Sequence, residues 1–341
     1  MDHALFSRRS VLASGMALGG AALAAPLGAQ APRFPVYGKV ERLDPSLDAL
    51  IDASAQAEIV MDGFTWSEGP LWVGGADGAL YNSDPRANSI TRWNERDGKA
   101  VWLAPSGYQS DAAAAGLREP GTNGLALGPA GIIAADSGTR AIVQIDLRTK
   151  KRTVIVDKFE GKRFNSPNDV VISAADGSMF FTDPPYGLAG GLDSDRREMD
   201  YTGVFRLGRD GKLSLIGKYT MPNGIALSPD GRTLYHTDAK IGWVAHALDA
   251  NGRSLSEKPF VDLAAEKVTA SGDGMKMDAN GNLWASSRDG LSIFNARGKR
   301  IGIVRLEGIV SNCDFGGDGN LYMTSNHQVG RIRVKARKIR T

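Results

Sequence analysis

The chain of 341 residues has a single cysteine, Cys313, and only four histidines. One cysteine cannot form a disulfide within the chain, and it excludes metal sites built from several cysteines. We expect Cys313 to be a small core residue. The net charge is only +3, and the one strongly basic stretch is the short C-terminal "RIRVKARKIR". Nucleic-acid binding is therefore not expected.

The only long stretch of small and apolar residues lies near the start of the chain. Arg8 and Arg9 precede "SVLASGMALGGAALAAPLGAQA", which ends in a small-x-small cleavage pattern after Ala31. This pattern resembles a Tat-type export signal. A membrane anchor is the alternative, but the stretch is short and rich in Gly and Ala. We expect the Tat export machinery to carry the protein to the periplasm, where residues 1–31 are removed. After this cleavage we expect no stable membrane association.

Glycine, in contrast, is abundant, with 42 residues that often stand in Asp-Gly, Asn-Gly or Gly-Gly pairs typical of turns. The stretch "MPNGIALSPDGRTLYHTD" at 221–238 predicts a hairpin. Related stretches start at Ser67, Thr122, Pro167, Gly272 and Val310. The predicted second strands end at intervals of 38 to 55 residues, at Asp84, Asp136, Asp183, Asp238, Ser287 and Ser325.

Repeats of this length with four short strands each predict an all-β fold, a six-bladed β-propeller with four-stranded antiparallel blades and a central channel. We assign residues 32–59 to an N-terminal approach segment, 60–335 to the propeller and 336–341 to a basic C-terminal tail. The approach segment holds the one helix candidate, "SLDALIDASAQAEI". The strand in "AEIVMDGF" is expected to join the last blade, because an open ring would leave exposed sheet edges.

One oxygen-bearing residue stands at the start of each predicted inner strand. We call these six the mouth residues: Glu68, Asn123, Asn168, Asn223, Asp273 and Ser311. In a propeller they would converge at one mouth of the channel. Oxygen donors without nitrogen or sulfur suit Ca²⁺ or Mg²⁺ better than Zn²⁺ or Cu²⁺. The alternative is ordinary turn chemistry, which also favours Asn, Asp and Ser at these positions. Carboxylates meeting on an axis, however, are costly without a cation.

Five stretches in order carry a family resemblance: "WSEGPLW", "RFNSPNDVV", "FFTDPPYGL", "MPNGIALSPDGRTLY" and "GDGMKMDANGNLW". They resemble the senescence marker protein (regucalcin)/gluconolactonase/luciferin-regenerating enzyme family, and its bacterial gluconolactonase branch most of all. The resemblance implies one divalent cation, with Ca²⁺ as first choice and Mg²⁺, Mn²⁺ or Zn²⁺ as alternatives. The implied ligands are Glu68, Asn168, Asn223 and Asp273. Animal members bind substrate with an arginine where this chain has Ser166, and the nearest arginine is Arg163.

The resemblance also implies a function, the metal-dependent hydrolysis of a sugar lactone such as D-glucono-1,5-lactone to gluconate. Asp273 would be the catalytic residue, as general base or as nucleophile. Besides Asn123, we expect Tyr186, Arg288 and His327 to bind substrate from rim loops that also carry Arg86, Arg140 and Lys240. The longest of these loops, 184–203, is a candidate lid. The alternatives are a hydrolase of other lactones, esters or phosphotriesters on the same site, and a non-catalytic propeller that binds a partner.

Overall fold

The computed structural model describes residues 34–75 and 78–339. The predicted export signal, 1–31, lies outside these residues and stays a prediction. Within the described ranges, the regular structure is almost entirely β, the exceptions being two short 3-10 helices, Pro45–Ala49 and Gly191–Asp193. None of the helices in this part of the chain has the length and apolar character needed to cross a membrane.

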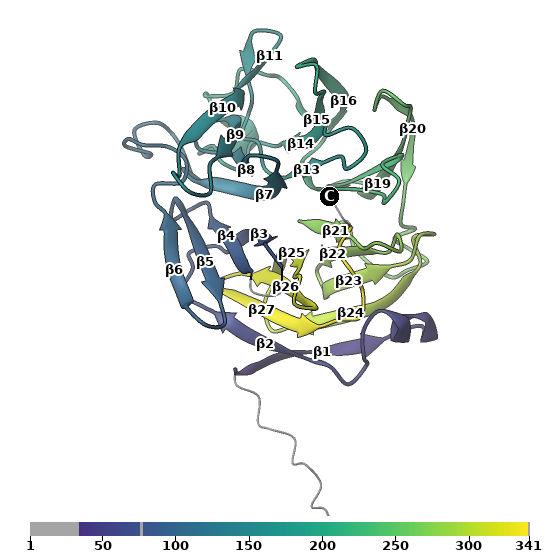
Figure 1. Cartoon of the computed structure of the whole chain (residues 1–341). Coiled ribbons are helices and arrows are strands. Elements are labelled where there is room, and N and C mark those ends of the chain that lie inside the picture. Colours follow the sequence, from purple (N-terminus) through teal and green to yellow (C-terminus); the bar gives the residue numbers. More distant parts are fainter. Residues whose placement is uncertain (1–33, 76–77, 340–341) are drawn as a thin grey trace, which may run out of the picture. The chain divides into compact units, whose positions relative to one another are not determined.

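Four separate sheets each contain four antiparallel strands in sequence order (Figure 1). The first consists of β3 (Glu68–Val73), β4 (Ala79–Asp84), β5 (Ser89–Asn94) and β6 (Gly98–Leu103). The second consists of β7 (Thr122–Gly128), β8 (Gly131–Asp136), β9 (Ala141–Ile145) and β10 (Arg152–Val156). The third consists of β13 (Val170–Ile172), β14 (Met179–Asp183), β15 (Thr202–Leu207) and β16 (Leu213–Tyr219). The fourth consists of β17 (Pro222–Leu227), β18 (Thr233–Asp238), β19 (Gly242–Leu248) and β20 (Ser254–Pro259).

A larger sheet of nine strands contains both ends of the described chain. Its C-terminal strands are β21 (Met275–Met277), β22 (Leu283–Ser287), β23 (Gly290–Phe294), β24 (Arg300–Leu306), β25 (Val310–Phe315), β26 (Asn320–Ser325) and β27 (Gln328–Arg333). Two N-terminal strands, β1 (Val36–Arg42) and β2 (Gln56–Met61), lie between β24 and β27. A separate two-stranded hairpin is formed by β11 (Lys158–Phe159) and β12 (Lys162–Arg163).

The N-terminal segment differs from the prediction in part. As predicted, the strand within "AEIVMDGF" pairs with the last strand, since β2 lies antiparallel to β27. Arg331 Nη2 also lies 3.2 Å from Glu58 Oε2 across this pair. The predicted helix over 46–59 is wrong: the 3-10 helix ends at Ala49, and Gln56 already begins β2. Burial of Ala57, Val60 and Met61 against the neighbouring strands favours the extended conformation there.

The first strands of the sheets contact one another in a closed order: β3, β7, β13, β17, β21, β25 and again β3. The predicted ends of the second strands are confirmed at all six positions, because β4, β8, β14, β18, β22 and β26 end at those residues. Four-stranded antiparallel sheets whose innermost strands meet in a ring are the arrangement of a β-propeller.

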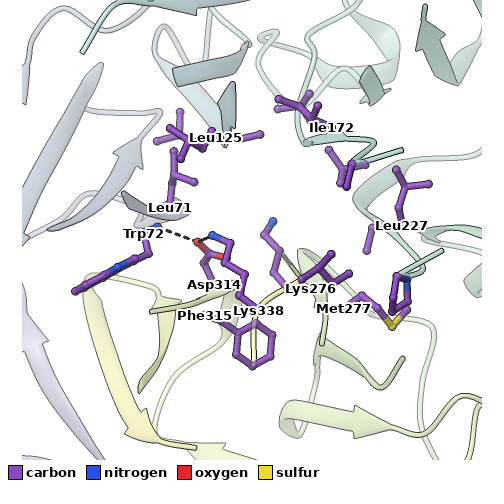
Figure 2. A pocket seen from close by; sticks show the side chains of 18 of the residues that line it. Leu71, Trp72, Leu125, Ile172, Leu227, Lys276, Met277, Asp314, Phe315 and Lys338 are labelled. Carbon is purple, nitrogen blue, oxygen red and sulfur yellow. Dashed lines mark hydrogen bonds and ion pairs between the residues drawn. The ribbon is translucent and has the colours of Figure 1, made fainter. Parts of the chain in front are cut away.

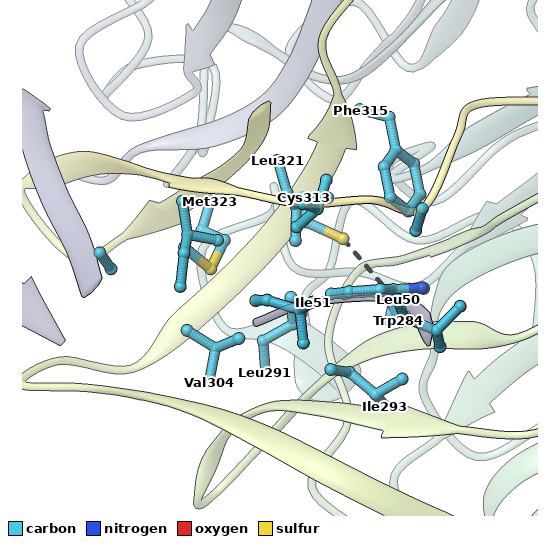
Figure 3. Close-up of a cluster of buried hydrophobic side chains, with 14 of the residues drawn as sticks. Leu50, Ile51, Trp284, Leu291, Ile293, Val304, Cys313, Phe315, Leu321 and Met323 are labelled. Carbon is cyan, nitrogen blue, oxygen red and sulfur yellow. Dashed lines mark hydrogen bonds between the residues drawn. The ribbon is translucent and has the colours of Figure 1, made fainter. Parts of the chain in front are cut away.

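The core lies between neighbouring sheets. In Figure 3, Leu50 and Ile51 of the N-terminal segment pack with Trp284, Leu291 and Cys313. Cys313 is fully buried, which confirms the predicted core position. Elsewhere, aromatic rings join sheets, as where Trp72 of β3 stacks on Tyr322 of β26 with 5.3 Å between ring centroids. The sheets are thus held together mainly by buried apolar contact.

The described part of the predicted basic tail packs on the fold. Ala336 is buried, and its backbone N–H donates to Leu50 O at 3.0 Å. Lys338 forms a β-bridge with Asp278 and places its ammonium 2.6 Å from Asp314 Oδ2. These contacts make the last described residues part of the folded domain.

Candidate active site

Five of the six mouth residues line one cavity of about 410 Å³. They come from five different sheets or sheet segments, each at or just before the start of an innermost strand. Tyr186, one of the four predicted substrate contacts besides the metal ligands, lines the same cavity. The cavity residues that carry predicted roles are Glu68, Asn123, Asn168, Asn223, Asp273 and Tyr186.

Aspartates at the ends of second strands fix the backbone in front of three mouth residues. Asp183 accepts hydrogen bonds from Asn165 N at 2.8 Å and from Ser166 N at 2.9 Å. These two N–H groups lie three and two residues before the mouth residue of that sheet. Asp84 and Asp238 accept from the equivalent pairs in their own sheets. A buried carboxylate with two backbone donors holds the chain so that the next side chain is directed to the channel.

Glycines next to mouth residues let neighbouring sheets approach closely. Gly224 N donates to Asp273 O at 3.1 Å, and a Cβ added to Gly224 would lie 2.2 Å from that oxygen. Gly124 N makes the corresponding bond to Asn168 O at 2.7 Å. The Asn-Gly pairs therefore serve more than turn chemistry: the first residue faces the cavity, and the second binds the backbone of the next mouth residue.

Burial and neighbouring carboxylates raise the pKa of two acids in the cavity lining, Glu68 and Asp273. Burial raises the pKa of Glu68 well above its usual range, and the charge of Asp273 raises it further. Burial also raises the pKa of Asp273 to about 8, with the charges of Asp169 and Glu119 adding to it. A hydrogen bond with Asn223 lowers the pKa of Asp273. A cation between such groups would reverse these shifts, since it stabilises both carboxylates.

The donor set fits a hard divalent cation. Among the described residues, no group of three or more His, Cys, Asp and Glu side chains could hold a metal ion. A metal at this mouth would therefore depend on the carboxamides of Asn168 and Asn223 together with Glu68 and Asp273, an oxygen-only set of the kind that Ca²⁺ uses.

Tyr186 connects the longest loop to the cavity. Its phenol is hydrogen-bonded to the Asn223 side chain, and burial raises its pKa to about 12. The loop 184–203 that carries it is tied to the loop before β7, because Arg118 N and Glu119 N both donate to Gly187 O. The lid role of this loop stays a prediction.

Several residues named from the sequence lie away from the cavity lining. Arg288 and His327 are exposed and absent from the lining, and His327 Nδ1 lies 2.8 Å from Phe64 O. Their roles in substrate binding stay predictions.

Ser311 is fully buried and donates to Ser67 O at 2.7 Å, so it joins sheets rather than facing the cavity. The expected rim position of Arg140 is wrong, because its guanidinium is buried and Nε donates to Phe164 O at 2.6 Å.

The position of the animal substrate arginine has a structural role here. The Ser166 hydroxyl donates to Pro184 O at 2.7 Å and accepts from Gly187 N at 2.8 Å. It therefore fastens the start of the loop 184–203. The nearest arginine, Arg163, donates to Thr139 O at 2.7 Å and is absent from the cavity lining. If this chain binds its substrate differently from the animal members, the groups that replace their arginine must come from other residues.

Sequence reasoning missed several residues of the lining, among them Trp66, Arg118 and Glu119. Arg118 and Glu119 belong to the long connection between β6 and β7, outside every repeat motif. The one available signal was a pair of opposite charges in "LREPG", directly before the second inner strand, within an otherwise weakly charged stretch.

A second cavity of about 530 Å³ lies at the other ends of the innermost strands (Figure 2). Its wall is mostly apolar, with Leu71, Leu125, Ile172, Leu227 and Phe315 among the lining residues. Its charged groups are Lys276, Lys338 and Asp314, and Asp314 also accepts from Trp72 N at 2.8 Å. Although this cavity is larger, it lacks the converging oxygen donors, so we place the candidate active site at the first mouth.

Comparisons with known proteins show which family and which solved structures the chain is similar to. A family model described as the SMP-30/Gluconolactonase/LRE-like region matches residues 66–327. The chain is 42% identical over 311 residues to a gluconolactonase from Zymomonas mobilis, covering 87% of this chain and 86% of that protein. A solved gluconolactonase from Xanthomonas campestris gives a TM-score of 0.75 at 28% identity, covering 89% of this chain and 98% of that one. A calcium-binding regucalcin from Agrobacterium tumefaciens gives 0.62 at 19% identity over 90% and 99% of the two chains, which shows a shared fold.

Proposed function

Because the chain belongs to the SMP-30/gluconolactonase/LRE-like family, we propose that it hydrolyses a sugar lactone with the help of one divalent cation. The family membership predicted from the motifs is confirmed, and the chain is an enzyme of the lactonase type. D-glucono-1,5-lactone, with gluconate as its product, is the first substrate to test. The observation that carries the proposal is the convergence of five mouth residues, two with carboxylates and three with carboxamides, on one cavity.

We further infer six blades. The nine-stranded sheet divides into β21–β24 and a second set of β25, β26, β27 and β2, with β1 as the strand that joins them. These two sets and the four separate sheets give six four-stranded units, one for each innermost strand in the ring.

The proposed cation would be held by Glu68, Asn168, Asn223 and Asp273. Ca²⁺ is our first choice, because it accepts six to eight oxygen ligands and tolerates irregular geometry. Bound there, it would polarise a lactone carbonyl and stabilise negative charge on the carbonyl oxygen. Asn123 belongs to β7 of the second sheet, lines the same cavity and is available to bind a substrate hydroxyl.

Asp273 is the group that we assign to proton transfer. A water oxygen bonds to the lactone carbonyl carbon, and Asp273 accepts the proton that the water loses. The bond from the carbonyl carbon to the ring oxygen then breaks, and this oxygen receives the proton. One water is consumed for each ring opened. ¹⁸O found in the Asp273 carboxylate after a single turnover in labelled water would instead identify a nucleophilic Asp273, in an acyl anhydride that water opens at the aspartyl carbon.

Asp273→Asn should keep an oxygen at the cavity but remove the base, since a carboxamide has no useful basicity. We expect kcat on D-glucono-1,5-lactone to fall by at least ~10²-fold at saturating metal. Asn223→Ala should mainly raise the metal concentration for half-maximal activity, with much of kcat restored at saturation. The matched control is Asn280→Ala in an exposed turn, which should change neither quantity.

The measurements are a lactonase assay over a panel of lactones, with and without chelator, and metal analysis of the purified protein. Near-normal kcat for Asp273→Asn would show that another group carries the proton. Activity that survives complete metal removal would contradict the cation. Hydrolysis of simple esters or phosphotriesters in place of sugar lactones would favour the alternative hydrolase, and absence of any turnover would favour a binding module.

A further inference from the structure

Glu119 is buried in the wall of the active-site cavity with one oxygen unused. Only 5% of the residue is exposed, and Oε2 has no hydrogen-bond partner among the described residues. Oε1 lies 3.9 Å from Arg86 Nε and 4.0 Å from Arg118 Nε, which is too far for a hydrogen bond. Burial raises the pKa of Glu119 to about 7, and the charges of Arg118 and Arg86 lower it.

A buried carboxyl with a free oxygen is costly, because it has lost water without gaining full compensation. A ligand that brings a hydroxyl donor to this oxygen would recover that cost. The charge of Glu119 also raises the pKa of both Glu68 and Asp273, so it lies within electrostatic reach of the proposed reaction centre. One ligand in a cavity of about 410 Å³ can therefore contact both regions.

The two arginines place guanidinium donors near the Glu119 carboxyl group. Their side chains are 42% and 46% exposed, for Arg86 and Arg118 respectively, so neither is buried in a fixed ion pair. The Arg86 guanidinium lies over the Trp66 ring, 5.2 Å from its centroid. An acceptor with two donors nearby matches neighbouring hydroxyl groups, since each hydroxyl both donates and accepts.

We propose that Glu119, close to Arg86 and Arg118, is the specificity-determining residue for polyhydroxylated lactones and accepts hydrogen bonds from their hydroxyl groups. This inference rests on the proposed lactonase function and names the part of the substrate that the enzyme distinguishes. A site built to bind hydroxyls disfavours an analogue that lacks them, because its buried polar groups then stay unpaired.

The test compares D-glucono-1,5-lactone with δ-valerolactone, which has the same six-membered lactone ring without hydroxyl groups. Glu119→Gln and Glu119→Leu should raise KM for the sugar lactone by about 10- to 100-fold, the range expected for a lost hydrogen bond to a charged group. The rate constant kcat/KM for δ-valerolactone should change by less than about 3-fold. The control Glu160→Gln removes an exposed carboxylate from the turn between β11 and β12, outside the cavity lining, and should change neither substrate.

Equal losses on both lactones would overturn the proposal, because Glu119 would then serve the reaction and not the hydroxyls. An unchanged KM for the sugar lactone in both variants would overturn it as well. The urea midpoint of each variant shows whether the protein is folded, and Glu119→Gln keeps the shape of the side chain if Glu119→Leu does not fold.

Binding of sorbitol, measured by calorimetry, separates this proposal from the proposed function. If the wild type hydrolyses neither lactone but binds sorbitol, and the Glu119 variants bind it at least about 10-fold more weakly, the hydroxyl site stands and the lactonase function fails. If the wild type hydrolyses the sugar lactone while sorbitol binds equally to wild type and variants, or not at all, the hydroxyl site fails and the lactonase stands.

Discussion

Replacing Gly224 with alanine would force apart two sheets that meet at the mouth of the candidate active site. The new Cβ would lie 2.2 Å from Asp273 O and 2.7 Å from Gly274 Cα, whereas ordinary contact begins at 3.4 Å. Both atoms belong to the backbone, so no side-chain rotation relieves the clash. Overpacking of this kind costs ~1–3 kcal/mol. Loss of the hydrogen bond from Gly224 N to Asp273 O adds ~1 kcal/mol.

We therefore expect Gly224→Ala to lower the free energy of unfolding by about 2–4 kcal/mol, measured by urea denaturation. Because the displaced carbonyl belongs to Asp273, cation affinity measured by calorimetry should also fall. Gly75→Ala is the matched control, since an added Cβ there meets nothing within 4 Å. A loss below about 0.5 kcal/mol, the range of ordinary surface substitutions, would refute the claim that close backbone approach at Gly224 sets the mouth.

Two further predictions concern stability away from the candidate active site. Burial lowers the pKa of His236 from 6.5 to about 4. Below pH 6.5 the unfolded state therefore binds a proton that the folded state does not bind until about pH 4, so the free energy of unfolding falls as pH drops from 6.5 toward 4. Between pH 7.5 and 4.5, measured in urea, we expect the unfolding free energy of His236→Gln to fall by up to about 3 kcal/mol less than that of the wild type. The exposed His327→Gln should keep the wild-type dependence on pH. The same dependence on pH in all three proteins would contradict this prediction. Lys338→Met should lower the unfolding free energy by about 1–3 kcal/mol at pH 7, because Asp314, whose side chain is 1% exposed, would lose its paired cation. If the further change Asp314→Asn restores stability, the unpaired carboxylate is the cause. Unchanged stability of Lys338→Met would exclude this cause.

Turn chemistry and strand periodicity were sufficient to locate the repeats and the mouth of the channel. The Asp-Gly and Asn-Gly turns have strong local preferences, and the strands between them are short, so their ends could be placed to the residue at Asp84 and Ser325. Five of the six mouth residues line one cavity for the same reason. Ser311 obeys the same register, yet its hydroxyl bonds to Ser67 O, a contact that depends on the neighbouring sheet.

Features set by contacts between distant segments could not be predicted in this way. Arg140 follows a Gly-Thr turn and reads as a solvent-exposed rim residue, but Phe164 O, 24 positions later, accepts from it in the interior. Glu119 owes its proposed role to the cavity wall and to Arg86 and Gly187, which belong to two other loops. Local preference likewise favoured a helix before β2, and pairing with β27 overrode it.

The closing pair of strands has a consequence for the order of events during synthesis. Glu58 and Arg331, which face each other across β2 and β27, are 273 positions apart in the chain. The N-terminal strand must therefore wait, with one edge unpaired, until nearly the whole chain has left the ribosome, and pairing over such a distance is slow. During this interval the open edge can pair with another molecule, so aggregation should be most severe before chain release. An export route that carries only folded proteins would accept this chain after synthesis has ended, never during it.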